Sequence, residues 1–444
     1  MLHLELHTVF FKKVNIKTKY FPYHLLRSEL LRSASVLISG TIIAQLISIL
    51  LQPILRRLFS PESFGIYSVY LSLVGMILVL CSLRYDDTIV LPKSDKESTN
   101  LLALSLIINF FFNLSILIIV IILGRRIISF LNLPKNFPVS ILYIIPLGAF
   151  LFSTYQSLNS WLIRRRKYLS ISINKLARRS SEGVAQISFA LIRSFNGLIY
   201  SDIIGQTANV ATVAFQTKKN ELNLRLVSLI KLKYVFRKYA EFPKYNLIPA
   251  FMSSCSYLLP PIFINKFYSP ETAGFFDLSK LLLSIPLAFI ASSISSVLLQ
   301  RISERFNKKE SFLTELKPIL YIVGLIAIIE ISTIILFGED LFKIVFGSQW
   351  ITSGKISKIM VWSFAFNFIA SSFTSIFVSM RRIKTYSIWQ CIYFISILSL
   401  LFFRHFPFNE FIKIYVSIEI FCYFLVTIIM FFIVYRYEST VLRS

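Results

Sequence analysis

Ten stretches of this chain are apolar and long enough to cross a lipid bilayer as helices. They occupy roughly 34–55, 66–83, 101–123, 139–163, 245–265, 275–299, 318–338, 359–380, 386–403 and 411–435. A helix needs about 20 residues to cross the hydrocarbon layer, where the backbone must satisfy its own hydrogen bonds. With 55% hydrophobic residues and a mean hydropathy of +0.69, the chain has more apolar side chain than one soluble core could bury. The lipid must therefore solvate most of it.

Two further stretches, 171–192 and 198–216, have helical length but carry charged and amide side chains. Polar helices of this kind avoid lipid and face a bundle interior or a water-filled cavity. Without them the chain has ten spans, and with them it has twelve. Only the count of twelve leaves six spans ahead of the basic segment 217–244. We therefore expect an all-α polytopic membrane protein with about twelve transmembrane helices.

Two short segments, 57–65 and 266–274, repeat each other at almost half the chain length. Their sequences are Arg-Leu-Phe-Ser-Pro-Glu-Ser-Phe-Gly and Lys-Phe-Tyr-Ser-Pro-Glu-Thr-Ala-Gly. Such a repeat indicates a duplicated membrane bundle, and six spans per copy give two parallel repeats. Ser60 and Ser269 are expected to cap the helices that follow them, with proline at the first helical position.

The net charge of +25 would suggest a nucleic-acid partner in a soluble protein. Here the cations gather in the segments between apolar runs, so they indicate topology and no nucleic-acid binding. With a cytoplasmic N-terminus, the inner segments carry 34 Lys and Arg and the outer loops carry 12. This asymmetry follows the positive-inside rule and predicts that both termini are cytoplasmic.

Charge and span pattern together predict five segments along the chain. They are a basic cytoplasmic segment 1–32, a six-helix lobe 33–216, a cytoplasmic linker 217–244, a second six-helix lobe 245–435 and a cytoplasmic tail 436–444. The first segment shows no removable signal peptide and is expected to lie on the inner membrane face. The four cysteines lie in apolar runs without paired spacing, and no HExxH motif occurs. We therefore predict no metal site and no cofactor.

Several short motifs resemble one family of membrane proteins. They are Ser39-Gly40-Thr41, Gln45, Ser60-Pro61-Glu62 with Gly65, and Leu83-Arg84-Tyr85-Asp86-Asp87 with Leu91-Pro92-Lys93. The chain resembles the polysaccharide-biosynthesis proteins, the O-antigen and repeat-unit flippases of the multidrug/oligosaccharidyl-lipid/polysaccharide exporter superfamily. The motif resemblance is densest over 33–100, while the span count and the duplicated segment extend it over the whole chain.

The resemblance implies an alternating-access flippase in the bacterial cytoplasmic (inner) membrane. Its two lobes would surround a central cavity and move undecaprenyl-pyrophosphate-linked oligosaccharide from the cytoplasmic to the outer leaflet. The family implies coupling to a proton or sodium gradient, and contacts with membrane lipid, a polysaccharide polymerase and a chain-length regulator. Arg84 is followed by Asp86 and Asp87, which partly offset its charge.

A carrier of pyrophosphate needs cations inside its cavity. Lys280 is the only Lys or Arg left outside the segments counted above for the two sides of the membrane, and Asp277 shares its helix face one turn earlier. Lys280 could bind phosphate or sugar while Asp277 tunes it, or the two could form an ion pair at the outer surface with Lys280 snorkelling. Arg56 and Arg84 are the other cationic candidates for the cavity.

Two acidic residues inside predicted spans are candidates for ion coupling. Glu330 lies near the middle of its span among isoleucines, and Glu419 lies in the last span. A desolvated carboxyl can carry a proton, but it can also be a neutral, hydrogen-bonded group that fixes helix packing. Arg179 and Glu182, three residues apart, are expected to form a structural pair.

Prolines interrupt equivalent spans of the two halves. Pro53 lies near the end of the first span, and Pro260 and Pro261 lie in the seventh. Proline removes a backbone donor and leaves a carbonyl free, so paired interruptions mark moving or binding elements. The alternative is that these spans simply end at the outer interface.

Three function classes remain open from sequence. The first is the lipid-linked oligosaccharide flippase, and the second is a multidrug or cation exporter of the same superfamily. The third is a polysaccharide polymerase or ligase, which needs a large outer loop for its substrates. The longest predicted outer loop is only about 339–358 and carries no acid-base constellation, so an enzyme is disfavoured.

Overall fold

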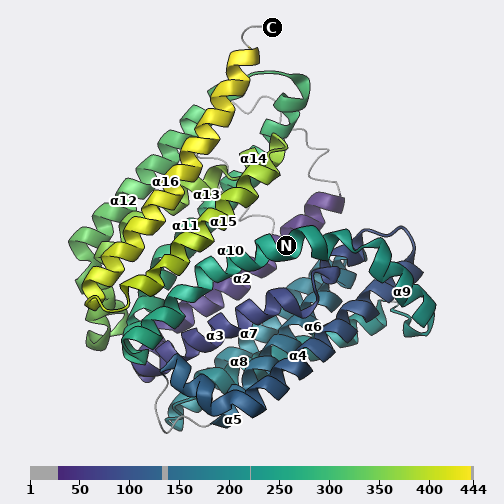
Figure 1. Cartoon of the computed structure of the whole chain (residues 1–444), viewed down its shortest axis with the longest axis horizontal. Helices are drawn as coiled ribbons and strands as arrows, with labels where there is room; N and C mark the ends of the chain where they lie inside the picture. Colours follow the sequence, from purple (N-terminus) through teal and green to yellow (C-terminus); the bar gives the residue numbers. More distant parts are fainter. Residues whose placement is uncertain (1–28, 133–138, 221, 442–444) are drawn as a thin grey trace, which may run out of the picture.

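The computed structural model describes residues 29–132, 139–220 and 222–441, and in these ranges the chain is helical, without strands (Figure 1). The predicted amphipathic segment before residue 29 lies outside the described residues. The long helices of the first half are α2 (Glu29–Leu58), α3 (Pro61–Cys81), α4 (Asp95–Leu131), α6 (Ile144–Arg164), α7 (Tyr168–Leu191) and α8 (Gly197–Lys219). Those of the second half are α10 (Glu241–Phe267), α11 (Pro270–Lys308), α12 (Leu313–Phe346), α13 (Ile351–Phe373), α15 (Ile383–Leu398) and α16 (Phe408–Val441).

Each of the twelve predicted spans overlaps one of these helices, and the all-α membrane fold is confirmed. Short elements join them: α5 (Val139–Leu142), α9 (Leu229–Lys238), α14 (Ser375–Ser379) and the 3-10 turns η1 (Tyr85–Val90), η2 (Leu224–Leu226), η3 (Ser348–Trp350) and η4 (Ser399–Phe403). Among the described residues, nine segments are long and apolar enough to cross a membrane. The segments of α6, α7 and α8 fall outside those nine.

The predicted outer loop 339–358 is wrong in length. Helix α12 continues to Phe346 and α13 begins at Ile351, which leaves residues 347–350 between them. The apolar stretches 318–338 and 359–380 miss these parts of the helices because the helices continue through charged residues such as Glu339 and Lys358. Glu339 of α12 and Lys358 of α13 form an ion pair of 2.8 Å that links these extensions.

The helices gather into two bundles that meet at one end and diverge toward the other (Figure 1). Helices α2, α4, α6, α7 and α8 pack on one another in the first bundle, and α11, α12, α13 and α16 do so in the second. Helix α3 of the first bundle contacts α10 and α11 of the second. The second bundle holds one large apolar core, whereas the apolar core of the first is split.

The segment between the bundles, 217–244, contains α9. Its Val235 is buried, while Leu229 and Ile230 are exposed. Lys238 donates a hydrogen bond of 2.5 Å to Glu97 of α4, and this bond raises the pKa of Lys238. Helix α9 is therefore fastened to the first bundle.

The two repeated Ser-Pro-Glu segments meet where the bundles join, and we call this place the junction end. Ser60 and Ser269 each accept a hydrogen bond from the backbone amide three residues on, at 3.2 and 3.1 Å, and Pro61 and Pro270 begin the helices. The predicted capping is therefore confirmed. The six residues of the two Ser-Pro-Glu motifs line a shared surface hollow.

Two glycines bring α3 and α11 into backbone contact at the junction end. A Cβ on Gly65 would lie 1.7 Å from the carbonyl oxygen of Pro270, and one on Gly274 would lie 1.9 Å from that of Pro61. The contact is reciprocal, so each repeat offers its glycine to the proline carbonyl of the other. Only glycine allows backbones to approach this closely.

We predict that Gly65→Ala and Gly274→Ala each lower the thermal unfolding temperature of the purified protein in detergent, because the new methyl group forces α3 and α11 apart. Gly324→Ala is the matched control, since a Cβ there would meet no described atom within 4 Å. Alanine favours a helix over glycine by about 1 kcal/mol, so the control should not lose stability. Equal unfolding temperatures for the three variants would contradict the close packing.

Candidate functional site

A cavity of about 460 Å³ lies between the two bundles. We call it the charged cavity, because its lining includes the charged and amide side chains of Gln45, Gln52, Arg56, Arg179, Glu182, Gln186 and Asp277. Helices α2, α3 and α7 form one wall and α11 forms the other. Along α11 the lining runs from Asp277 to Ser292, roughly 22 Å at 1.5 Å per residue.

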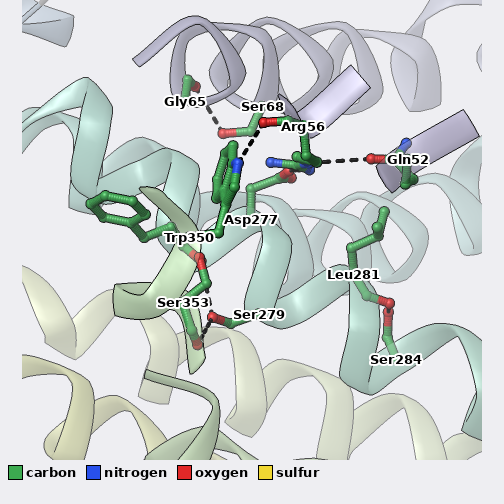
Figure 2. Close-up of polar contacts among 11 residues, drawn as sticks. Gln52, Arg56, Gly65, Ser68, Asp277, Ser279, Leu281, Ser284, Trp350 and Ser353 are labelled. Carbon is green, nitrogen blue, oxygen red and sulfur yellow. Dashed lines mark hydrogen bonds and ion pairs between the residues drawn. The ribbon is translucent and has the colours of Figure 1, made fainter. Parts of the chain in front are cut away.

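Arg56 closes the charged cavity toward the junction end. Its side chain is only 1% exposed and donates to Asp277 of α11 at 2.5 Å and to Gln52 at 3.2 Å (Figure 2). Its guanidinium carbon lies 3.6 Å from the centre of the Phe64 ring. Guanidinium suits such a place because it stacks on aromatic faces and pairs with carboxylates in a fixed geometry. Among the described residues, its Nη1 atom has no hydrogen-bond partner.

The backbone at the end of α2 holds the two bundles together. The carbonyl of Arg56 accepts hydrogen bonds from Trp350 Nε1 at 2.6 Å (Figure 2) and from Gln349 Nε2 at 2.7 Å. The side chain of Arg57 donates to the carbonyl of Ile344 at 2.6 Å. The carbonyls of Arg56 and Ile344 can accept these bonds because the last four carbonyls of a helix have no partner inside it. Trp350 therefore lies at the contact between the two bundles.

The two polar spans supply a second set of charges. Arg179 and Glu182 of α7 pair at 3.0 Å as predicted, and both line the charged cavity. Arg178 pairs with Asp202 of α8 at 3.3 Å, and Asp202 also accepts from Tyr70. Sequence reasoning placed these helices at an interior or a cavity but missed Glu182 as a lining residue. The charged residues within the helix-length segment 171–192 were the sequence feature that could have indicated Glu182.

Lys280 and Asp277 each bind a different partner: Asp277 pairs with Arg56, and Lys280 binds Tyr257. Lys280 is 7% exposed, donates to the carbonyl of Tyr257 at 2.6 Å and stacks on the Tyr257 ring at 3.3 Å. In a regular helix that carbonyl would accept from residue 261, which is Pro261 and has no N–H. The proline interruption of α10 therefore frees the carbonyl that binds Lys280. Lys280 is not among the residues that line the charged cavity.

The acidic candidates lie in the second bundle. Glu419 is 5% exposed and accepts a hydrogen bond of 2.9 Å from Tyr393, which in turn accepts one from Tyr423. Lys280 interacts electrostatically with Glu419. Glu330 of α12 is half-buried, its Oε2 has no partner among the described residues, and the preceding Ile328 and Ile329 are exposed.

Two other predicted residues lie apart from this polar lining. Arg84 sits in the left-handed backbone region with φ +66° and pairs with Asp87 at 2.8 Å. It follows the end of α3 opposite to the junction end. Pro53 lies inside α2, one turn before Arg56, and cannot donate to the carbonyl of Ile49, which lines the charged cavity.

The model of one protein family, described as polysaccharide biosynthesis protein, matches residues 54–355. The chain belongs to this family. The match covers the charged cavity's α3 and α7, the end of α2 and all of α11. The resemblance noted from the sequence motifs is thus confirmed. A comparison with curated proteins found no match in sequence.

Solved structures share the fold of this polysaccharide biosynthesis protein over most of its length. The lipid II flippase MurJ in an inward closed conformation is 14% identical, with a TM-score of 0.71 over 88% of this chain and 86% of that one. An inward-facing multidrug resistance MATE family transporter of the MOP superfamily is 15% identical, with a TM-score of 0.69 over 93% and 99%. An outward-facing MATE transporter gives 0.55 at 13% identity over 93% and 95%. The chain therefore shares the fold of these structures, and its long apolar helices make it a multi-pass membrane protein.

We predict that Asp277→Asn lowers the stability of the purified protein by roughly 2–3 kcal/mol, since it leaves the buried Arg56 without its counter-charge. Glu304→Gln is the control, because it breaks the exposed Lys308–Glu304 pair of 2.8 Å on the same helix and should cost less than about 1 kcal/mol. Thermal unfolding in detergent measures both. Equal effects would show that the Arg56–Asp277 pair does not support the junction end.

Proposed function

We propose that this protein moves polyprenyl-pyrophosphate-linked oligosaccharide repeat units, such as those built on undecaprenyl, from the cytoplasmic to the outer leaflet of a bacterial inner membrane. The observation that carries the proposal is Arg56, a buried cation with one carboxylate partner at the closed end of a cavity between two helix bundles. Pyrophosphate is an anion that bidentate guanidinium recognises well. The family of the chain supports a substrate of polysaccharide biosynthesis.

The charge distribution supports an orientation for this movement. With both termini in the cytoplasm, the junction end lies at the outer side and the bundles diverge toward the cytoplasm, where lipid-linked repeat units are made. The segments 33–216 and 245–435 would then act as two lobes that separate at the junction end when the outer side opens, with 217–244 as their cytoplasmic linker. Helix α9 of the linker is bound to α4 through Glu97, so it would move with the first lobe.

The competing candidate is a drug or cation exporter, which the likeness to MATE transporters and the acidic residues Glu182 and Asp277 favour. In the charged cavity, however, each of these carboxylates pairs with an arginine, at 3.0 Å for Arg179–Glu182 and 2.5 Å for Arg56–Asp277. Both carboxylates are thus already paired, whereas Arg56 keeps Nη1 without a hydrogen-bond partner among the described residues and can donate it to an anion. The lining therefore supports an anionic substrate.

Ion coupling belongs to the second bundle in this proposal. Glu419 is enclosed by tyrosines and lies within electrostatic reach of Lys280, so binding of a proton or sodium ion there would change the charge beside the α10 interruption. Glu330 is a second candidate, because its carboxyl is half-buried. Proton release or uptake at either site would couple the gradient to the movement of the lobes.

We predict that a strain without this protein accumulates completed lipid-linked repeat units on the cytoplasmic leaflet, because the charged headgroup cannot cross hydrocarbon unaided. Leaflet-resolved labelling of the glycan measures this distribution. A wild-type copy is the control and should restore outward labelling. Normal outward labelling in the deletion strain would contradict the flippase. If that strain also lost resistance to drugs, the result would indicate the exporter.

Lys280→Ala is predicted to reduce transport severalfold while membrane abundance stays near that of the wild type. The substitution removes the ammonium that occupies the free Tyr257 carbonyl and alters the field at Glu419. Complementation of the deletion strain, with immunoblotting of membranes, measures both quantities. Lys308→Ala, which removes an exposed lysine of the same helix, is the control. Full complementation by Lys280→Ala would leave Lys280 only a packing role.

A further inference from the structure

A second cavity, of about 480 Å³, lies in the C-terminal bundle between α10, α11 and α13. It shares Ala288 and Ser292 with the charged cavity, so the two meet along α11. Beyond Asp277 the α11 residues that line the two cavities are uncharged, and serines and alanines recur among them. Ser284 lies two turns beyond Asp277, roughly 10 Å along the axis, and the small residues continue to Ser295.

Among the described residues, no charged side chain lines this second cavity, and its polar groups are hydroxyls and one amide. They are Tyr257, Ser284, Ser292, Ser295, Asn367, Ser371 and Thr374. We call it the hydroxyl cavity. An ionised ligand group buried here would meet no side chain of opposite charge, which is costly. The lining therefore suits an uncharged polar ligand.

The hydroxyl cavity offers more acceptors than donors. Ser292 donates to the carbonyl of Phe289 at 3.0 Å and Ser371 to that of Phe368 at 3.2 Å, so each hydroxyl proton is used within its own helix. Asn367 uses its amide nitrogen on the Tyr423 hydroxyl at 2.9 Å. Ser292 and Ser371 have only oxygen lone pairs left, while Asn367 keeps one N–H and its amide oxygen. Such a lining binds ligands that bring many hydroxyl or amide donors.

Aromatic rings complete the hydroxyl cavity. Tyr257 is 48% exposed and offers part of its ring surface, and the largely buried Phe364 and Phe368 also line the cavity. An aromatic surface beside hydrogen-bonding groups suits a ligand that is apolar on its ring face and polar at its rim. Sugar rings have this character. Lys280, on the Tyr257 ring, is itself buried and not part of the lining.

We propose that the hydroxyl cavity is a binding site for neutral sugar residues, the ones that follow the pyrophosphate in the transported lipid. This site rests on the proposed function, because it assigns Arg56 to the pyrophosphate and the hydroxyl cavity to the adjoining sugars. It further predicts selectivity: a first sugar that carries a carboxylate would bind worse than a neutral one. The selective contacts come from α11 and α13, away from the arginines.

The test uses the full-length protein in lipid nanodiscs and three fluorescent short-chain polyprenyl pyrophosphates. The first carries no sugar, the second a neutral N-acetylhexosamine disaccharide, and the third the same disaccharide with a uronic acid as its first sugar. Two or three added hydrogen bonds should make the neutral disaccharide bind about tenfold more tightly than the bare pyrophosphate. The uronic acid probe should lose most of that gain.

Two cavity-filling variants locate the site. Ser284→Leu and Ser295→Leu, at positions that line the hydroxyl cavity but not the charged cavity, should each abolish the tenfold gain while binding of the bare pyrophosphate stays unchanged. Ser293→Leu is the control, since Ser293 is exposed on the same turn, bonds its own helix at 2.9 Å and does not line the cavity. Thermal unfolding confirms that each variant is folded. Arg56→Gln should weaken binding of all three probes.

The outcomes separate the two levels of the proposal. Equal binding of bare and glycosylated probes, or an unchanged gain in both cavity-filling variants, would overturn the sugar site and leave the pyrophosphate site standing. Equal or tighter binding of the uronic acid probe would overturn the selectivity for neutral sugars. Probe binding that does not depend on Arg56 would instead contradict the proposed function.

Discussion

The rest of the structure depends on the burial of Arg56 where the two helix bundles join. A cation taken out of water is costly unless carboxylates, polar groups and aromatic faces replace its hydration. Here Asp277 comes from the other bundle and Gln52 and Phe64 from the same one. The backbone carbonyl of Arg56 accepts hydrogen bonds from the side chains of Trp350 and Gln349. Arg56 thus closes the junction end and places a cation at that end of the charged cavity.

This arrangement suggests how an anionic substrate could act on the lobes. A pyrophosphate that binds Arg56 competes with Asp277 for the same guanidinium, and the loss of that pair removes a link between the bundles. The reciprocal contacts of Gly65 and Gly274 would be the remaining link at the junction end, and they must also part before the outer side opens. Binding energy of the substrate would then contribute directly to opening the outer side.

Much of the fold follows from sequence, because the length of an apolar stretch and a capping motif are local properties of the chain. The repeat can likewise be seen by comparing two segments of the sequence. The Ser60 and Ser269 caps and all twelve helices could be predicted in this way. The Arg56–Asp277 pair could not, since 221 positions separate its members and the i,i+3 neighbour Lys280 offered Asp277 a nearer partner. The proline argument predicted a free carbonyl, yet only packing shows that Lys280 takes the one at Tyr257. Glu182 escaped notice as a cavity residue because its pair with Arg179 looked purely structural.

The central claim is that Arg56 binds the pyrophosphate of a lipid-linked oligosaccharide during its passage between leaflets. The most direct measurement is leaflet transfer of a fluorescent polyprenyl-pyrophosphate oligosaccharide in liposomes that contain the purified protein and an imposed ion gradient. The account predicts gradient-dependent transfer by the wild-type protein and little transfer by Arg56→Gln at equal protein density. Transfer at the same rate by both proteins, or none by the folded wild type under either a proton or a sodium gradient, would contradict it.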